Sequence, residues 1–245
     1  MPTRRTLLIF GGVALWVGGI RTVSTFTERL SPFEFTPLDQ PEGFRALAAE
    51  GGSSPSRGAF DFTIGLKLGE AAPRPTGGAE DVTEGLFSQS DGKGTPVAYF
   101  FDYYCPYCRI LSGHLSELVS EEEIALTRHH WPIFGATSEL AARAALAAGM
   151  QGAFAAIHDR FIRTPVRVTP AYLSQVADDL GLTWPRMQAD MQSETVDEEL
   201  DRSRMLADIF GFYGTPALVV GRTVVQGEIA PDRLHALARL ERREA

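Results

Sequence analysis

The 245-residue chain has only two cysteines, Cys105 and Cys108, and both belong to a single Cys-Pro-Tyr-Cys segment. A secreted scaffold held together by disulfides needs more cysteines spread along the chain, so this fold must depend on its hydrophobic core. A structural zinc site needs four ligands, and the chain has no second CxxC pair and only five histidines, none at HxxxH spacing. We therefore expect no bound metal and no cofactor, and we interpret the two cysteines as chemically active.

An excess of basic charge is also absent, because 31 acidic residues outnumber 23 basic ones and the formal net charge is −8. The chain has no basic stripe interleaved with aromatic residues. Nucleic acids attract proteins through such positive surfaces, so we expect no nucleic-acid partner. The hydrophobic fraction of 44% is that of an ordinary globular protein.

The apolar stretch near the N-terminus is short. It runs from Leu7 to Ile20, whereas a transmembrane helix needs about 20 apolar residues. Arg4 and Arg5 precede it, and the segment Thr3-Arg-Arg-Thr-Leu-Leu8 resembles a twin-arginine export signal. No clear small-x-small cleavage site follows, so residues 1–21 are either an export signal or an uncleaved membrane anchor, with a buried core helix as the remaining alternative. Both export interpretations place the rest of the chain outside the cytoplasm.

Residues 22–94 are rich in Pro, Gly and Ser, which favour loops. Within them, the alternation over 60–64 predicts a short strand, and 43–50 are compatible with a brief helix. We interpret residues 22–94 as an irregular N-terminal extension packed onto the main domain.

The pattern is clearer from Thr95 onward, which defines a domain over 95–245. Pro96–Asp102 is an apolar, aromatic-rich run typical of a buried strand, the CxxC follows it, and apolar residues at helical spacing come next. A hairpin and a closing helix end the chain. The predicted elements are strands at 96–102, 124–130, 217–220 and 223–226, and helices at 109–120, 138–150, 152–162, 170–180, 184–193, 196–210 and 231–239. This order predicts an α/β thioredoxin fold with an inserted helical domain at about 135–210.

A Cys-x-x-Cys pair at a helix start has a physical rationale. Free backbone N–H groups and the helix dipole at that end favour negative charge, which lowers the pKa of the first thiol. We therefore assign Cys105 as the exposed nucleophile and Cys108 as the resolving thiol. The alternatives are half of a zinc site or two buried structural thiols.

The segment Phe101-Asp-Tyr-Tyr-Cys-Pro-Tyr-Cys108 resembles the active site of DsbA-like proteins, above all the branch that includes the suppressor-of-copper-sensitivity proteins. The resemblance covers about residues 95–240, including the start of the insert at Pro132-Ile-Phe-Gly135. It implies a DsbA-like thioredoxin fold. A second motif, Gly214-Thr215-Pro216, implies a cis proline against the CxxC and a preceding backbone that pairs with an extended substrate. The residues expected to bind substrate are Thr215, Pro216, Pro106 and Tyr107.

The resemblance implies a thiol–disulfide oxidoreductase of the periplasm or cell envelope. We expect it to act as a dithiol oxidase on protein substrates and to have a membrane redox partner. Reduction or isomerisation would use the same residues, and the sequence does not fix the direction. The alternatives from other classes are a copper(I)-binding protein that uses both thiolates, and an interaction module with idle thiols.

Other polar and aromatic residues near the motif carry weaker signals. We expect His114, His129 and His130 to be surface or packing residues rather than ligands or catalysts. Tyr103, Tyr104 and Tyr107 either line a substrate groove or pack in the core. Asp102 would tune the thiol pKa only if its carboxylate reaches the cysteines.

Overall fold

The computed structural model describes residues 32–48, 79–88, 90–164 and 166–244. The predicted export segment at 1–21 and the predicted strand at 60–64 lie outside these ranges. Within the described ranges, no helix combines the length and the apolar character needed to cross a membrane.

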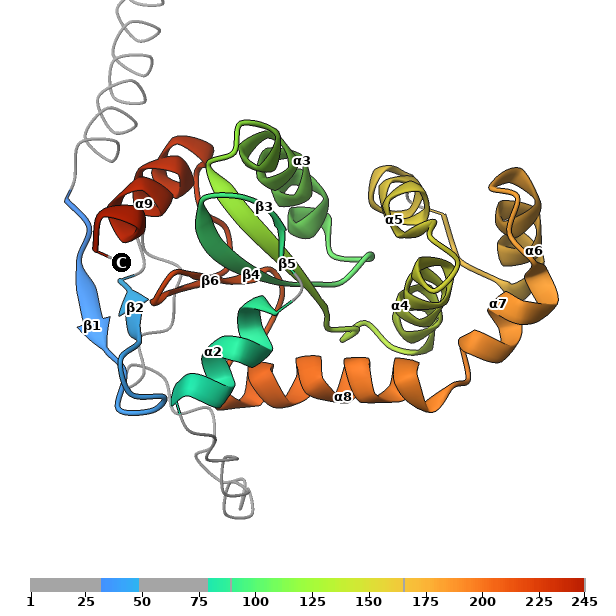
Figure 1. Cartoon of the computed structure of the whole chain (residues 1–245), viewed down its shortest axis with the longest axis horizontal. Helices are drawn as coiled ribbons and strands as arrows, with labels where there is room; N and C mark the ends of the chain where they lie inside the picture. Colours follow the sequence, from blue (N-terminus) through green and yellow to red (C-terminus); the bar gives the residue numbers. More distant parts are fainter. Residues whose placement is uncertain (1–31, 49–78, 89, 165, 245) are drawn as a thin grey trace, which may run out of the picture. The chain divides into compact units, whose positions relative to one another are not determined.

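Seven strands of the described chain form one mixed sheet, in the order β1-β2-β7-β6-β4-β5-β3 (Figure 1). Strand β4 lies in its interior, parallel to β5 and antiparallel to β6, while β6 and β7 form a hairpin. The strands are β1 (Phe35–Pro37), β2 (Arg45–Leu47), β3 (Asp91–Gly92), β4 (Thr95–Phe101), β5 (Ile124–His130), β6 (Ala217–Val220) and β7 (Thr223–Gln226).

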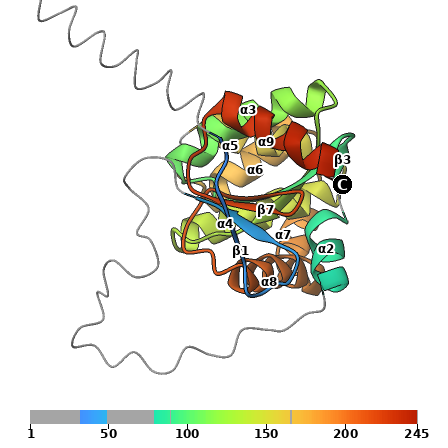
Figure 2. The same ribbon diagram turned by 90° about the vertical axis from the view of Figure 1, so that its left-hand side faces the viewer.

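Helices cover both faces of this sheet. Helices α3 (Pro106–Ser120) and α9 (Pro231–Glu244) lie on one face, and α2 (Ala79–Phe87) and α8 (Glu194–Ile209) lie on the other. Figure 2, which looks from the β1 side, shows the strands between α3 and α9 above and α8 below. A strand covered on both faces needs apolar side chains that point to both sides, and Val97–Phe101 of β4 supply them.

Successive β4 side chains enter the two apolar layers in turn. Phe100 packs in the layer formed with α2 and α8, where Leu206 and Phe212 are among its neighbours. Tyr99 points to the opposite face and reaches α3 with its hydroxyl. The strand that precedes the CxxC is therefore fixed from both sides.

The remaining helices form the insert between β5 and β6. They are α4 (Ala136–Gly149), α5 (Phe154–Arg163), α6 (Pro170–Asp179) and α7 (Trp184–Asp190), followed by α8. Alanines fill most of the buried face of α4, and their small side chains let α5, α7 and α8 approach it closely. Thr169 caps α6, because its hydroxyl accepts a hydrogen bond from the Tyr172 backbone N–H at 3.2 Å. Thr183 precedes α7 without a side-chain cap.

The helix expected over 43–50 is wrong, because Arg45–Leu47 forms strand β2. This strand runs parallel to β7, and the Arg45 guanidinium bonds to Thr223 Oγ1 at 2.9 Å and Glu241 Oε1 at 2.6 Å. The same guanidinium lies 3.8 Å from the Phe35 ring centroid. Long-range pairing thus overrides a local composition that suits a helix. The described parts of residues 22–94 supply strands β1, β2 and β3 and helix α2.

Candidate active site

Cys105 is the N-cap residue of α3, with φ −77° and ψ 118°. Pro106 occupies the first turn, where its missing N–H costs no hydrogen bond. The Cys105 sulfur accepts a hydrogen bond from the Cys108 backbone N–H at 3.4 Å, and its thiol donates to the Thr215 carbonyl at 3.2 Å. Both cysteines are free thiols and both are buried. The expectation that Cys105 is exposed is therefore wrong, because the Thr215 loop and the start of α3 cover its sulfur. The nucleophile thus contacts the helix start on one side and the loop before β6 on the other.

The two thiols have opposite pKa shifts. A hydrogen bond from the Cys108 thiol, helped by Thr215 and by backbone N–H groups, lowers the pKa of Cys105 to about 6 against the opposing effect of burial. Burial, followed by the hydrogen bond to Cys105, raises the pKa of Cys108 far above its usual value. Near neutral pH the site therefore holds one thiolate, on Cys105, and one thiol that stabilises it.

The loop before β6 completes the geometry. The Thr215–Pro216 peptide bond is cis. The Pro216 carbonyl accepts a bond from the Gly227 backbone N–H at 2.9 Å, and the Gly214 carbonyl accepts one from the Gln226 side chain at 2.9 Å. These bonds hold the loop against the sheet, with the Thr215 backbone facing the Cys105 sulfur.

Tyr99 positions the first turn of α3, and the sequence analysis did not identify this role. Its hydroxyl donates to the Cys108 carbonyl at 2.9 Å and lies 3.2 Å from the Ser112 hydroxyl. The only sequence signal was an aromatic residue in a buried strand, which does not distinguish a core residue from one that positions a helix. The bond ties the first turn of α3 to the interior of the sheet.

Asp102 holds the backbone segments around the cysteines in place, and its side chain does not contact the thiols. Its carboxylate accepts four hydrogen bonds. The donors are Tyr104 N (2.8 Å), Ser138 Oγ (2.8 Å), Ile133 N (2.8 Å) and Phe134 N (3.2 Å). Its backbone carbonyl accepts a bond from Cys105 N at 3.1 Å. This buried side chain therefore joins the CxxC loop to the start of the insert.

Asp102→Asn is expected to lower the free energy of unfolding by about 3 kcal/mol, because an amide NH₂ would face donors that now bond to a carboxylate oxygen. Denaturant unfolding measures this loss as a lower midpoint at an unchanged slope. Asp208→Asn, at an exposed position near the end of α8, serves as the matched control. An Asp102→Asn protein as stable as this control would contradict the assigned role.

Comparison with known proteins identifies this arrangement. Residues 96–238 match the model of the DSBA-like thioredoxin domain. The chain belongs to this family. The DsbA-like resemblance inferred from the CxxC segment is thereby confirmed.

Solved structures share this DsbA-like fold. A thioredoxin-like oxidoreductase from Silicibacter pomeroyi DSS-3 is 32% identical, with a TM-score of 0.61 over 66% of this chain and 98% of its own. A periplasmic thioredoxin-like protein from Salmonella enterica serovar Typhimurium is 25% identical, with a TM-score of 0.59 over 69% and 99%. The catalytic domain of Proteus mirabilis ScsC is 21% identical, with a TM-score of 0.58 over 67% and 96%, which shows the shared fold.

A curated relative is much longer than this chain. The Na(+)/H(+) antiporter NhaA 3 of Salinispora tropica is 28% identical over 127 residues, which cover 51% of this chain and 20% of the antiporter. The chain thus spans about a fifth of the length of the curated relatives it matches.

The histidines near the DsbA-like site lie mainly in the core. His129 stacks on Phe100 and its Nε2 lies 3.0 Å from the Leu86 carbonyl. The Tyr103 hydroxyl lies 3.3 Å from His130 Nε2 and 3.1 Å from His158 Nδ1, and burial lowers the pKa of His158 to about 3. Within the described residues, no three His, Cys, Asp or Glu side chains gather as metal ligands would.

Of the other expected positions, His114 is half-buried on α3, with Nδ1 3.9 Å from a Glu117 carboxylate oxygen. Tyr104 is half-buried, and Pro106 and Tyr107 are exposed at the start of α3. Tyr107 thus remains available to a substrate, whereas Tyr103 is part of the core.

Exposed apolar side chains lie on three segments: the CxxC itself, residues 133–134, which bond to Asp102, and the loop before Thr215, which bonds to Cys105. We name them the apolar rim: Tyr107, Ile133, Phe134 and Tyr213. Tyr107 lies within the CxxC, Asp102 holds Ile133 and Phe134 by their backbone N–H groups, and Tyr213 lies two residues before Thr215. Exposed aromatic side chains grouped in this way are typical of a surface that binds other proteins.

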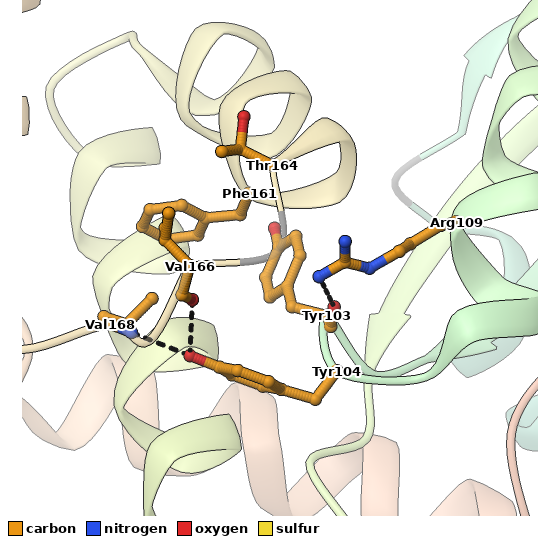
Figure 3. A pocket seen from close by; sticks show the side chains of 7 residues that line it. All are labelled: Tyr103, Tyr104, Arg109, Phe161, Thr164, Val166 and Val168. Carbon is orange, nitrogen blue, oxygen red and sulfur yellow. Dashed lines mark hydrogen bonds between the residues drawn. The ribbon is translucent and has the colours of Figure 1, made fainter.

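A hollow lies beside the CxxC, between the start of α3 and the residues that connect α5 to α6 (Figure 3). Its lining residues are Tyr103, Tyr104, Arg109, Phe161, Thr164, Val166 and Val168. The Tyr104 hydroxyl donates to the Val166 carbonyl at 3.1 Å and accepts from the Val168 N–H at 2.8 Å. These bonds fix one wall of the hollow.

Proposed function

We propose that this enzyme oxidises dithiols in exported proteins, with Cys105 as the sulfur that substrates attack. The observation that supports this direction is the position of the Cys105 sulfur at the start of α3, where it accepts hydrogen bonds from the Cys108 backbone N–H and the Cys108 thiol. These contacts stabilise the thiolate, which exists only in the reduced enzyme. A disulfide whose reduced form is stabilised is a stronger oxidant.

The reaction begins with the oxidised enzyme, in which Cys105 and Cys108 form a disulfide. A substrate thiolate attacks Cys105 Sγ, and the electron pair of the broken S–S bond passes to Cys108, which takes up a proton. The second substrate thiolate then attacks the substrate sulfur of the mixed disulfide and releases Cys105 as a thiolate. Two electrons move from the substrate dithiol to the enzyme, which ends with one thiolate and one thiol.

Extended protein chains are the proposed substrates. The apolar rim offers exposed contacts to the apolar side chains of an unfolded chain, and the Thr215 backbone is placed to pair with its main chain beside the reacting sulfur. We assign Thr215, Pro216, Pro106 and Tyr107 to substrate binding on this basis.

The proposed location is the periplasm or cell envelope. The arginine pair and short apolar run within residues 1–21 support export, as a signal or as an anchor, and the related Salmonella protein is periplasmic. Return to the oxidised state then requires a disulfide-bearing membrane protein that accepts two electrons from Cys105 and Cys108.

The redox equilibrium of the full chain with glutathione tests the direction. We expect a reduction potential above about −200 mV, well on the oxidising side of the roughly −270 mV of thioredoxin. A potential near −270 mV would instead indicate a reductase. Absence of reversible exchange, with Cu(I) binding by the reduced protein in its place, would overturn the proposal in favour of the copper-binding alternative. A Cys105→Ser protein is the control.

A further inference from the structure

We propose that the Tyr99 hydroxyl assists disulfide exchange by donating a hydrogen bond to the Cys108 sulfur while a substrate thiolate breaks the Cys105–Cys108 bond. This inference rests on the proposed function, because it concerns the attack of a substrate on the oxidised enzyme. That attack leaves a negative charge on a buried sulfur, and Tyr99 is the side chain beneath it in β4.

Cys108 carries the charge that develops in this step. The substrate sulfur forms a bond to Cys105 Sγ, the bond between the two enzyme sulfurs breaks, and its electron pair passes to Cys108 Sγ. Burial raises the pKa of Cys108 far above its usual value. A thiol of high pKa is a slow leaving group, so a hydrogen bond that stabilises its thiolate speeds the step. Cys108 then takes up one of the two protons that the substrate dithiol loses, and Tyr99 keeps its own.

The Tyr99 hydroxyl lies against the first two turns of α3. It donates to the Cys108 carbonyl at 2.9 Å and lies 3.2 Å from Ser112 Oγ. Because its single proton is used on Cys108, Ser112 is the donor in the second bond. The same hydroxyl is within hydrogen-bonding reach of the Cys108 thiol. The bond from Ser112 polarises the phenol and makes it a better donor to Cys108.

This hydroxyl stays protonated while the enzyme works. Burial and the nearby Cys108 raise the pKa of Tyr99 well above its usual value, so the phenol keeps its proton and acts as a donor. The carbonyl that it now bonds to is neutral, and hydrogen bonds to a charged acceptor are about twice as strong. The O–H group therefore turns from the carbonyl to the sulfur when the charge forms, and returns when Cys108 is protonated.

Two other groups also favour the Cys108 thiolate. The backbone of Asp102 and the side chain of Thr215 lower the pKa of Cys108 against the effect of burial. Tyr99 differs from both, because its hydroxyl can be removed without a change to the backbone or to the loop expected to bind substrate. Tyr99→Phe keeps the ring that stacks on Phe101 and removes only the hydroxyl.

The test is the rate at which a dithiol peptide reduces the oxidised full-length enzyme near neutral pH. We expect Tyr99→Phe to lower the second-order rate constant about 10-fold, because a hydrogen bond to a charged group is lost in the transition state. Tyr172→Phe should keep the wild-type rate. It is a matched control, since it removes a phenol hydroxyl that bonds to Arg160, on α6 of the insert (Figure 1). A Tyr99→Phe enzyme as fast as the wild type would overturn the inference.

Two further measurements separate this role from a purely structural one. The pH midpoint of Cys105 should stay at about 6 in Tyr99→Phe, because the groups that bond to the Cys105 sulfur remain. The redox equilibrium with glutathione should change less than about twofold, because neither the disulfide nor the Cys108 thiol carries the charge that Tyr99 stabilises.

A slower reaction accompanied by a shifted midpoint or a shifted equilibrium would show that the hydroxyl only holds the start of α3, and would also overturn the inference. Failure of the proposed function would look different, because the wild-type enzyme itself would then leave the dithiol peptide unoxidised.

Discussion

Cys105→Ser is expected to reduce disulfide exchange to the rate of the uncatalysed reaction. Cys105 is the only thiol with a lowered pKa, and its sulfur contacts the loop on which the substrate backbone is expected to pair. A serine hydroxyl forms no disulfide, so no mixed disulfide can arise at this position. The measurement is the rate at which the oxidised full chain converts a dithiol peptide to its disulfide, compared with peptide alone.

Cys108→Ser provides the matched control, since it removes the second thiol and leaves the first. The pKa of the Cys108 thiol is raised, so this thiol stays protonated near neutral pH and is the poorer nucleophile of the two. Mixed with a peptide that carries its cysteine as a disulfide with glutathione, this variant should attack the peptide sulfur through Cys105, release glutathione as a thiol, and accumulate a mixed disulfide that is visible on a nonreducing gel. Turnover that survives Cys105→Ser, or a mixed disulfide formed through Cys108, would contradict the assignment of roles.

The pH dependence of Cys105 reactivity is expected to have its midpoint at about 6. Because the pKa is lowered from 9.0, the thiolate is present above pH 6 and is lost as the pH falls through 6. At pH 6 the thiolate fraction is about 500 times that of a thiol with a pKa of 9.0. The thiolate of a less basic thiol is also a weaker nucleophile. With a Brønsted coefficient of about 0.45, a pKa lowered from 9.0 to about 6 reduces the rate constant of the thiolate roughly 20-fold. The net expectation is a reaction about 25 times faster than that of an ordinary thiol at the same pH.

Stopped-flow reaction of the reduced protein with a small disulfide reagent, across pH 4 to 9, measures this profile, and a cysteine peptide is the reference. Cys108→Ala should raise the midpoint, because it removes the thiol whose hydrogen bond is the largest cause of the lowered pKa. A midpoint near 8.5 in the wild-type protein, equal to that of the peptide, would show that the helix start does not stabilise the thiolate.

Local sequence patterns predicted much of the sheet and most helices. Strand β5 has the predicted bounds, Ile124–His130, and the hairpin strands β6 and β7 also match. Helix α3 starts at Pro106, three residues before the predicted start, because proline suits the first turn of a helix. Local sequence patterns do not reveal strand β2, because it has only three residues. Its partners are also distant in the sequence, since Arg45 bonds to Thr223, 178 residues away.

The sequence predicted the parts of the candidate site that belong to a short motif. It did not predict the parts that depend on residues distant in the sequence. The CxxC and the Gly214-Thr215-Pro216 motif identify the residues that the structure brings together. The role of Asp102 depends on donors about 30 residues later in the chain, and local sequence does not show which of them will face the carboxylate.

The hairpin of β1 and β2 determines where the autonomous folding unit begins. Strand β2 covers β7, and Arg45 neutralises the buried Glu241 of α9, which also bonds to Thr223 at 2.5 Å. A piece cut at the family boundary near residue 96 would expose the backbone of β7 and leave that carboxylate without its cation. Open strand edges recruit other chains, so such a piece would tend to self-associate. A folding unit that keeps β7 paired and Glu241 neutralised therefore includes the hairpin at 35–47, although it lies far from the cysteines in sequence.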